Sequence, residues 1–252
     1  VADQPGNGQP GDGEAITIHK AVIRAKGGSV VMTGTSGNGG GDGVAIDGDS
    51  AVGSDATTGL SITGIARGDG GRGVDIDRTV LISSGSVTID GEAVDSSGIR
   101  LRDTTDGDAI LSISGNDVTL RGQSTSNIGV LISRLQDLNA TRHLLIEAEG
   151  SVSGSSTAAR GVSIGETKAV AGGNMIISGI EDNYATGGNT GVFLDDSAFT
   201  VTGAVAIRGE VTQDGVAGVY LDWDQNTVAA GMVVSGASVI IEGISAVDAP
   251  GV

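Results

Sequence analysis

Apolar and polar residues alternate over short runs along almost the whole chain. Such alternation is typical of β-strands, because successive strand residues point to opposite sides, whereas a helix repeats every 3.6 residues or so. The most regular run reads Gly, apolar, any residue, then Ile or Leu. It begins at Gly43, Gly73, Gly98, Gly129, Gly161, Gly191 and Gly218. The starts lie about 30 residues apart, which indicates a repeat architecture.

A second run keeps the same interval and reads apolar, any residue, apolar, any residue, Gly. It ends at Gly34, Gly64, Gly91, Gly122, Gly179, Gly209 and Gly243. The copy at 143–148 ends on Ala148 in place of glycine, and we expect a small insertion in it. Glycines and clusters of Ser, Asp and Asn separate the runs and predict turns. The leucine-rich segment 129–148 is the one place where we expect a helical turn to intrude.

Short strands every 30 residues or so are typical of a parallel β-helix, in which each repeat makes one coil and pairs with its equivalents about 4.8 Å away. The apolar positions of the first motif then form two interior columns. The first column is Val44, Val74, Ile99, Val130, Val162, Val192 and Val219, and the second is Ile46, Ile76, Leu101, Ile132, Ile164, Leu194 and Leu221. We therefore predict an all-β, right-handed parallel β-helix of about eight coils, roughly 40 Å long.

An antiparallel β-sandwich also has short strands and glycine turns. It does not explain why the same two motifs return in the same order along the chain, so we favour the solenoid. We interpret residues 1–13 as a lead-in loop or partial coil and residues 14–252 as β-helix coils. The ends lack the polar caps that a complete solenoid needs, and we expect the chain to be part of a longer protein.

The amino-acid composition excludes several functional classes for this chain. The chain has 45 glycines in 252 residues, no cysteine, two Phe, two Tyr and one Trp, and a formal net charge of −17. We expect no nucleic-acid partner, because such binding requires a basic face. The chain offers no thiolate ligands for a zinc or iron–sulfur centre, and no run reaches the 18 or so apolar residues of a membrane span.

The Gly-Val-x-Ile and Val-x-Ile-x-Gly coils, in a Cys-free chain rich in Gly, Ser, Thr, Val and Asp, resemble the rod region of large bacterial exoproteins. The similarity is to two-partner-secretion adhesins of the filamentous haemagglutinin type, and it covers nearly the whole chain. The resemblance implies secretion through an outer-membrane partner and a location outside the cell or on its surface. It also implies a role in adhesion or biofilm formation, with a host-cell receptor or an extracellular polysaccharide as partner.

The outward positions of the first motif form columns of their own. We expect Asp75 to pair with Arg100 and Asp77 with Arg102 across neighbouring coils, as surface ion pairs worth at most about 1 kcal/mol each. In the same columns Phe193 should lie over Tyr220 in solvent.

Two hypotheses concern the surface around these rings. In the first, a sugar ring binds to the aromatic rings of Phe193 and Tyr220, with Asp195 and Asp222 beside it. In the second, the two aromatic rings pack against a local loop such as the one around Tyr184. Asp195 and Asp222 would be like charges about 5 Å apart, which is unfavourable without a cation or water between them.

Candidate calcium ligands occur in two Asp-rich loops. They are Asp222, Asp224 and Asn226 in the first, and Asp103, Asp106 and Asp108 in the second. Carboxylate and amide oxygens at alternate positions are the ligands that Ca²⁺ prefers, but Thr227 and Val233 depart from the EF-hand pattern. We expect no obligatory cofactor and keep calcium as a hypothesis.

Arg67-Gly68-Asp69 matches an integrin-binding tripeptide, and we expect it in an accessible corner loop, although chance explains so short a motif nearly as well. Many β-helices cleave polysaccharides, which needs carboxylates clustered with basic groups. Here His19 and His143 fall in different coils and lysines are scarce. We therefore predict a non-enzyme, with a polysaccharide lyase or hydrolase as the weakest alternative.

Overall fold

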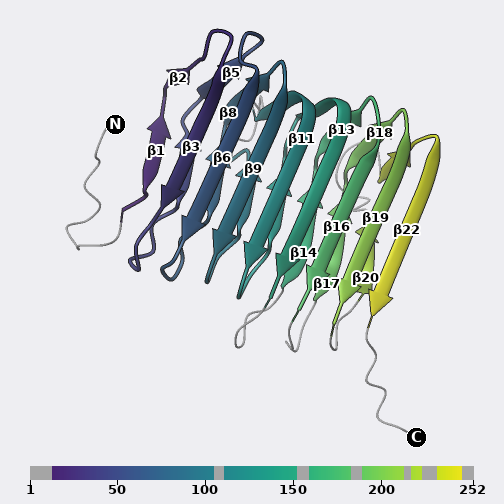
Figure 1. Ribbon diagram of the computed structural model, residues 1–252. Coiled ribbons are helices and arrows are strands. Elements are labelled where there is room, and N and C mark those ends of the chain that lie inside the picture. The colour runs from purple at the N-terminus through teal and green to yellow at the C-terminus, as the bar shows by residue number, and fades with distance from the viewer. Residues whose placement is uncertain are drawn as a thin grey trace, which may run out of the picture.

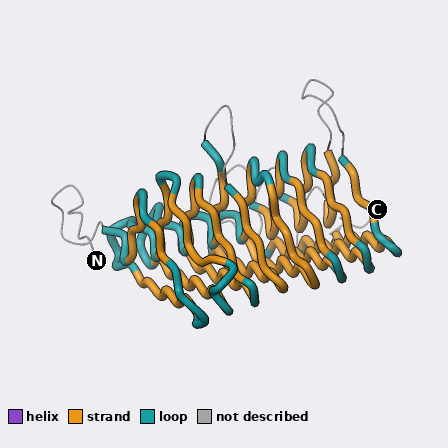
Figure 2. The backbone as a smooth tube through the Cα atoms, turned by 90° about the horizontal axis from the view of Figure 1, so that it is seen from above, coloured by secondary structure: helices purple, strands orange, loops and turns teal. Residues whose placement is uncertain are grey.

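The computed structural model describes residues 13–104, 111–151, 159–182, 189–212, 217–222 and 232–245. Every regular element in those ranges is a β-strand, and Figure 2 shows the strands joined by turns and loops alone. The helical turn predicted within 129–148 is wrong, because this segment forms strands β12 (Val130–Ser133) and β13 (Asp137–Gly150). None of the described residues belongs to a helix of the length and apolarity that a bilayer span requires.

Each coil contributes a strand to each of three faces. The first face is an 8-stranded sheet made of β1 (Ile16–His19), β4 (Val44–Asp47), β7 (Val74–Asp77), β10 (Ile99–Arg102), β12 (Val130–Ser133), β14 (Arg160–Gly165), β17 (Thr190–Asp195) and β20 (Ala217–Asp222). The motif Gly-apolar-x-Ile/Leu forms this face, as the sequence predicts.

The other two faces form one continuous 14-stranded sheet. The second face consists of β2 (Val22–Ile23), β5 (Ser50–Ser54), β8 (Thr79–Ser83), the first part of β11 (Ser112–Ser124), the first part of β13 (Asp137–Gly150), β15 (Lys168–Ala171), β18 (Ala198–Val201) and β21 (Val233–Ser235). The third face consists of β3 (Ser29–Thr35), β6 (Gly59–Ala66), β9 (Ser86–Ala93), the second parts of β11 and β13, β16 (Met175–Glu181), β19 (Ala204–Val211) and β22 (Ser238–Ser245). The faces join because β11 and β13 run unbroken around the corner between them.

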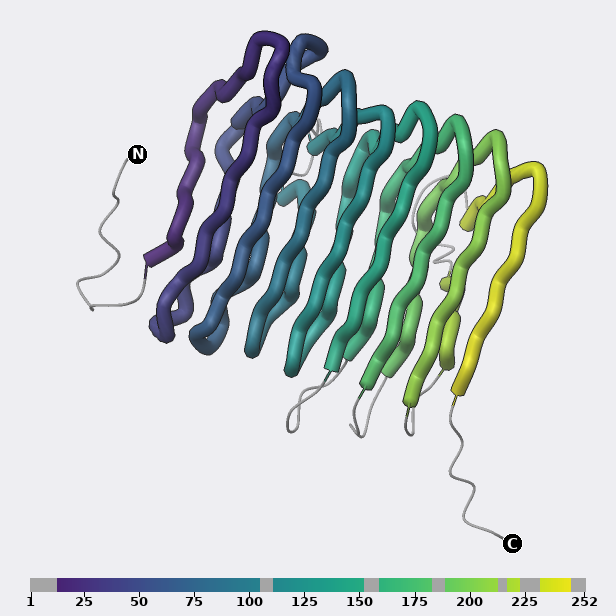
Figure 3. Tube along the Cα trace, viewed as in Figure 1, coloured from purple at the N-terminus to yellow at the C-terminus, as the bar shows by residue number. Residues whose placement is uncertain are grey.

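All pairings between coils are parallel, and they keep the predicted register apart from one shift between β11 and β13. Val74 lies opposite Ile99 and Ile76 opposite Leu101, and the same correspondence continues along both predicted interior columns. In Figure 1 the near strands run downward while the coil advances to the right, which makes the coil right-handed. The colours of Figure 3 follow one another along the axis, so each coil contacts its immediate neighbours. The predicted parallel β-helix is confirmed.

The first motif missed one rung, the opening strand of the first coil, although the second motif had found this coil through Gly34. Ile16 and Ile18 pair with Val44 and Ile46, so the first rung begins with Ala15-Ile16 where later copies have Gly-Val. The expected insertion near residue 143 is present as a register shift. Gly115 pairs with Ala140, and Asp117 pairs with His143, so β13 holds one extra residue there.

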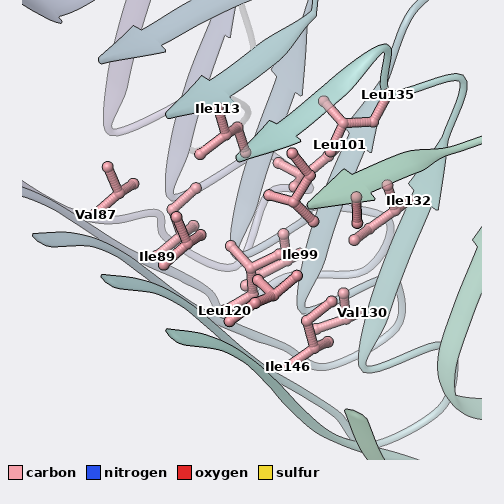
Figure 4. Close-up of a cluster of buried hydrophobic side chains, with 14 of the residues drawn as sticks. Val87, Ile89, Ile99, Leu101, Ile113, Leu120, Val130, Ile132, Leu135 and Ile146 are labelled. Atoms are coloured by element: carbon pink, nitrogen blue, oxygen red, sulfur yellow. The ribbon is translucent and has the colours of Figure 1, made fainter. Parts of the chain in front are cut away.

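The interior is a dry stack of branched aliphatic side chains. Figure 4 shows side chains of the three faces pointing toward one another, including Ile99 of β10 and Leu120 of β11. Val74, Ile76, Ile99 and Leu101 are fully buried. One ring enters this core: Phe199 of β18 is also fully buried and fits because its neighbour one coil away is Ala169.

The motif glycines form the narrow edge where the third face meets the first. A Cβ added to Gly64 would lie 1.9 Å from the carbonyl oxygen of Gly73, and one added to Gly73 would lie 2.3 Å from the backbone nitrogen of Glu92. The backbones of the two faces therefore touch directly at this edge. This close approach, and not an unusual backbone angle, explains why one motif ends on glycine and the next begins on it.

The interior columns lose their burial at the last described coil. Leu221 is 41% exposed although it pairs in register with Leu194, and Ile241 of β22 is 46% exposed. These side chains have a neighbouring coil on one side only among the described residues, which is the physical reason for their exposure.

Candidate functional site

The predicted aromatic column exists on the outer surface of the first face. Phe193 of β17 and Tyr220 of β20 pair in register, with ring centroids 5.6 Å apart and ring planes within 4° of parallel. The guanidinium carbon of Arg160 lies 3.8 Å from the centre of the Phe193 ring. Arg160 comes from the preceding coil and Tyr220 from the following one, so both faces of Phe193 are covered. A ligand would meet Tyr220, which is 41% exposed, more readily than Phe193.

The positive charge at this stack belongs to Arg160, and Asp195 and Ser163 interact with its guanidinium. Burial lowers the pKa of the Arg160 guanidinium, and the carboxylate of Asp195 opposes that shift. Nη1 of Arg160 donates a hydrogen bond of 3.0 Å to Oγ of Ser163. Asp195 and Asp222 lie opposite each other in neighbouring strands, as the sequence predicts. The loop around Tyr184, the alternative packing partner, lies outside the described residues.

The two calcium hypotheses fall mostly outside the described residues, where Asp224, Asn226, Asp106 and Asp108 lie. Asp103 is described and is 3% exposed, and its carboxylate accepts a hydrogen bond of 3.3 Å from the backbone nitrogen of Leu111. Within the described ranges no three His, Asp or Glu side chains lie close enough to hold a metal ion together. Calcium binding stays a prediction.

The Arg67-Gly68-Asp69 tripeptide lies in the turn after β6, with Arg67 and Asp69 exposed and Gly68 buried. A Cβ on Gly68 would come within 2.5 Å of the backbone of Asn38 and Gly40, so the turn lies directly on the turn of the preceding coil. The end residues are accessible as predicted, but the centre of the motif is packed. Integrin binding stays a prediction.

An ion-pair cluster extends across the coils beside the first face. The guanidinium of Arg100 makes a two-pronged contact with the carboxylate of Asp75, through Nε at 2.7 Å and through Nη2. Both side chains are far less exposed than a surface pair, at 12% for Arg100 and 15% for Asp75. Arg102 lies 4.0 Å from Asp77 and is 40% exposed. The predicted partners are correct, but the expectation that both are ordinary surface pairs is wrong for the first.

Sequence reasoning missed two members of this cluster, Asp42 and Arg72. The backbone nitrogen of Arg72 donates a hydrogen bond of 2.6 Å to Oδ1 of Asp42, and Nη1 of Arg72 lies 3.7 Å from Asp75. Burial raises the pKa of Asp42 to about 6, against the opposing effect of the hydrogen bond from Arg72. The signal was present: Asp42 and Arg72 both directly precede the first motif glycine, one coil apart.

A second feature that the sequence analysis missed is a groove of about 490 Å³ on the outer surface of the third face. It crosses β6, β9, β11, β13 and β16. Its lining includes the outward residues on both sides of the motif glycine: Asp90, Glu92, Arg121, Gln123, Glu147 and Glu149, with Ile65 and Ile180 at its ends. Nε of Arg121 lies 3.1 Å from Glu147, and Nη1 of Arg121 lies 4.0 Å from Asp90. The signal for this groove was the charged residues that flank the motif glycine in the middle coils.

The two histidines occupy separate coils, as expected. Nδ1 of His19 lies 2.6 Å from the carboxylate of Asp47, and Nδ1 of His143 accepts a hydrogen bond of 3.1 Å from the backbone nitrogen of Asn174.

No protein-family model, curated protein or solved structure matches this chain. The class that the structure defines is therefore that of a parallel β-solenoid, and a more specific assignment has to be argued from its surfaces.

Proposed function

We propose that the chain is a structural shaft segment of a secreted or surface-attached bacterial adhesin, which holds a distal binding site away from the cell. The observation that supports this proposal is the continuous parallel pairing of eight successive coils around one aliphatic interior. A backbone ladder of this kind resists bending, because every coil is bonded to the next along its full length. The proposal assigns the chain no catalytic role.

Secretion through an outer-membrane partner, and a part in adhesion or biofilm formation, follow from the resemblance to two-partner-secretion exoproteins. The absence of cysteine agrees with passage through the periplasm, where stray thiols would be oxidised. The surface location is tested by labelling intact cells with antibodies raised against this chain. Labelling of intact cells supports the proposal, and labelling only after lysis contradicts it.

The spacer role is tested by the distance between labelled coils. Val31 and Ile240 lie in one outward column of the third face, seven strand spacings apart, and Ile176 lies in the same column after five. Spin labels on Val31→Cys/Ile240→Cys should therefore be about 34 Å apart, and those on Val31→Cys/Ile176→Cys about 24 Å apart.

Electron–electron double resonance on these pairs should give one narrow distribution for each, with means that grow in proportion to the number of coils. A broad distribution for the longer pair, or a distance that does not grow with the number of coils, would show a flexible chain and overturn the spacer proposal.

A second candidate function is carbohydrate binding at the aromatic column, as for a biofilm polysaccharide. It is favoured by the exposure of Tyr220 next to Asp222 and the stacked Phe193. A glycan array with the unaltered chain and with Tyr220→Ala tests it, and Val170→Ala, an exposed apolar position on the second face, is the matched control. Loss of binding in the first variant alone supports a sugar site. Absence of glycan binding, or equal binding by both variants, contradicts it.

A further inference from the structure

The floor of the groove on the third face consists of residues with little or no side chain. The inward positions at the edge where the third and first faces touch are occupied by Gly64, Gly91, Gly122 and Ala148. These four residues line the floor of the groove, and the outward side chains before and after them form its two sides. The hollow runs along the axis from β6 to β16, which is four strand spacings or about 19 Å. Most of its lining surface is apolar.

Charged side chains form two rows along this hollow. The row before the motif glycine is Asp90, Arg121 and Glu147, in which Arg121 contacts both carboxylates. The row after it is Glu92, Gln123 and Glu149. The groove therefore carries four carboxylates and one guanidinium.

The second row is the more strongly acidic of the two. Its carboxylates face a single amide, since Nε2 of Gln123 donates a hydrogen bond of 3.4 Å to Glu149. Within the described part of the chain the carboxylate of Glu92 has no hydrogen-bond or ion-pair partner. The excess of negative charge in this row favours a cationic ligand, and the net charge of −17 repels anionic ones.

The spacing of the acidic row selects among cationic ligands. Glu92 and Glu149 are separated by two strand spacings, about 9.6 Å. A polyproline II helix advances about 9.3 Å over its three-residue turn, so basic residues at every third position fall on one side with nearly the same interval. An extended strand brings same-side residues only about 6.8 Å apart and does not match. Proline rings at the peptide positions between the basic residues would pack against the apolar floor of the groove.

The geometry points to this groove as a docking site for an extended, proline-rich cationic peptide of about six residues in the polyproline II conformation. Its ammonium groups lie beside Glu92 and Glu149, and its apolar side covers the glycine floor between Ile65 and Ile180. The site goes beyond the shaft role and does not depend on it.

Isothermal titration of the whole chain with a terminally blocked (Pro-Pro-Lys)3 peptide tests the site. We expect saturable binding that weakens at least tenfold in Glu92→Gln/Glu149→Gln. The matched control is Glu210→Gln/Glu242→Gln, which removes the same charge from strands β19 and β22 of the same face, outside the groove. This control should bind within twofold of the unaltered chain. Comparison peptides are (Pro-Lys)4 and (Pro-Pro-Glu)3.

Three results overturn the proposal. The first is no binding of (Pro-Pro-Lys)3 to the unaltered chain at low salt. The second is equal weakening in both double variants, which means diffuse attraction to an acidic protein. The third is tighter binding of (Pro-Lys)4, or of an oligomer of glucosamine, with the same dependence on Glu92 and Glu149, which assigns the groove to a different ligand. Unchanged circular dichroism melting of both variants excludes a folding effect.

Discussion

At the scale of single residues, the strongest constraint comes from side chains that are missing. The repeat begins and ends on glycine because the first and third faces touch there, as Gly64 and Gly73 illustrate. The sequence shows where these glycines are, and the alternation around them predicts strands. It does not show that the two glycine columns meet, because that contact exists only after the coil closes.

Gly91→Ala should therefore lower the free energy of unfolding by about 1–3 kcal/mol, the usual cost of overpacking. Its Cβ would lie 2.1 Å from the carbonyl oxygen of Gly98, which is backbone and cannot turn aside. Gly165→Ala is the control, since nothing lies within 4 Å of its added Cβ. Urea unfolding of both variants measures the difference. Equal stability of the two would contradict direct contact between the faces.

Asp42 gives a pH-dependent prediction. Because burial raises its pKa from 3.8 to about 6, the folded protein binds this proton more tightly than the unfolded chain. The resulting stability is complete below about pH 3.8 and is lost as the pH rises through about 6. Asp42→Asn, which keeps an acceptor for the Arg72 backbone, should match the unaltered chain at pH 3.5 and exceed it by up to about 3 kcal/mol at pH 7.

Urea unfolding of the two proteins across this pH range measures the effect. A difference that is already present at pH 3.5, or that fails to grow between pH 4 and 6, would show that the protonation of Asp42 is not its source.

At the scale of the strands, register converts sequence spacing into contacts. Residues one repeat apart become neighbours, which is why the partners Asp75–Arg100 and Asp77–Arg102 could be predicted. Their environments could not, because burial depends on the adjoining turns. Asp42 and Arg72 come from such turns. Arg72 forms ion pairs with both Asp42 and Asp75, so these two residues extend the Asp75–Arg100 pair and not the Asp77–Arg102 pair.

The two pairs should differ in stability accordingly. Arg100→Met leaves the largely buried Asp75 without its two-pronged partner and should cost about 1–3 kcal/mol. Arg102→Met removes a pair that is longer and more exposed, and should cost less than about 1 kcal/mol. Thermal unfolding of both variants at low and high salt measures this. A larger loss for Arg102→Met would contradict the difference in burial.

At the scale of the whole molecule, the fold was predictable because each coil repeats the last. An error in one copy does not spread, as the missed strand at Ile16 shows: the second motif still placed this coil through Gly34. The candidate sites were less predictable. The aromatic column follows from register alone, whereas the groove depends on how the outward side chains beside the glycine column lie in the folded chain. Ala148 stands in a glycine column, and it pairs with Gly122 and Gly179 in the register of the column.

The central claim, parallel stacking of successive coils in register, is tested most directly by disulfide trapping in this Cys-free chain. Thr88 pairs with Thr119 and Asp90 with Arg121 on the outer surface of the third face, within the Cα range that a disulfide bridges. Under mild oxidation Thr88→Cys/Thr119→Cys and Asp90→Cys/Arg121→Cys should both cross-link within the chain. Thr88→Cys/Arg121→Cys, about 8 Å apart, should not. Cross-linking of the last pair in preference to the first two would mean antiparallel or shifted strands and would contradict the account.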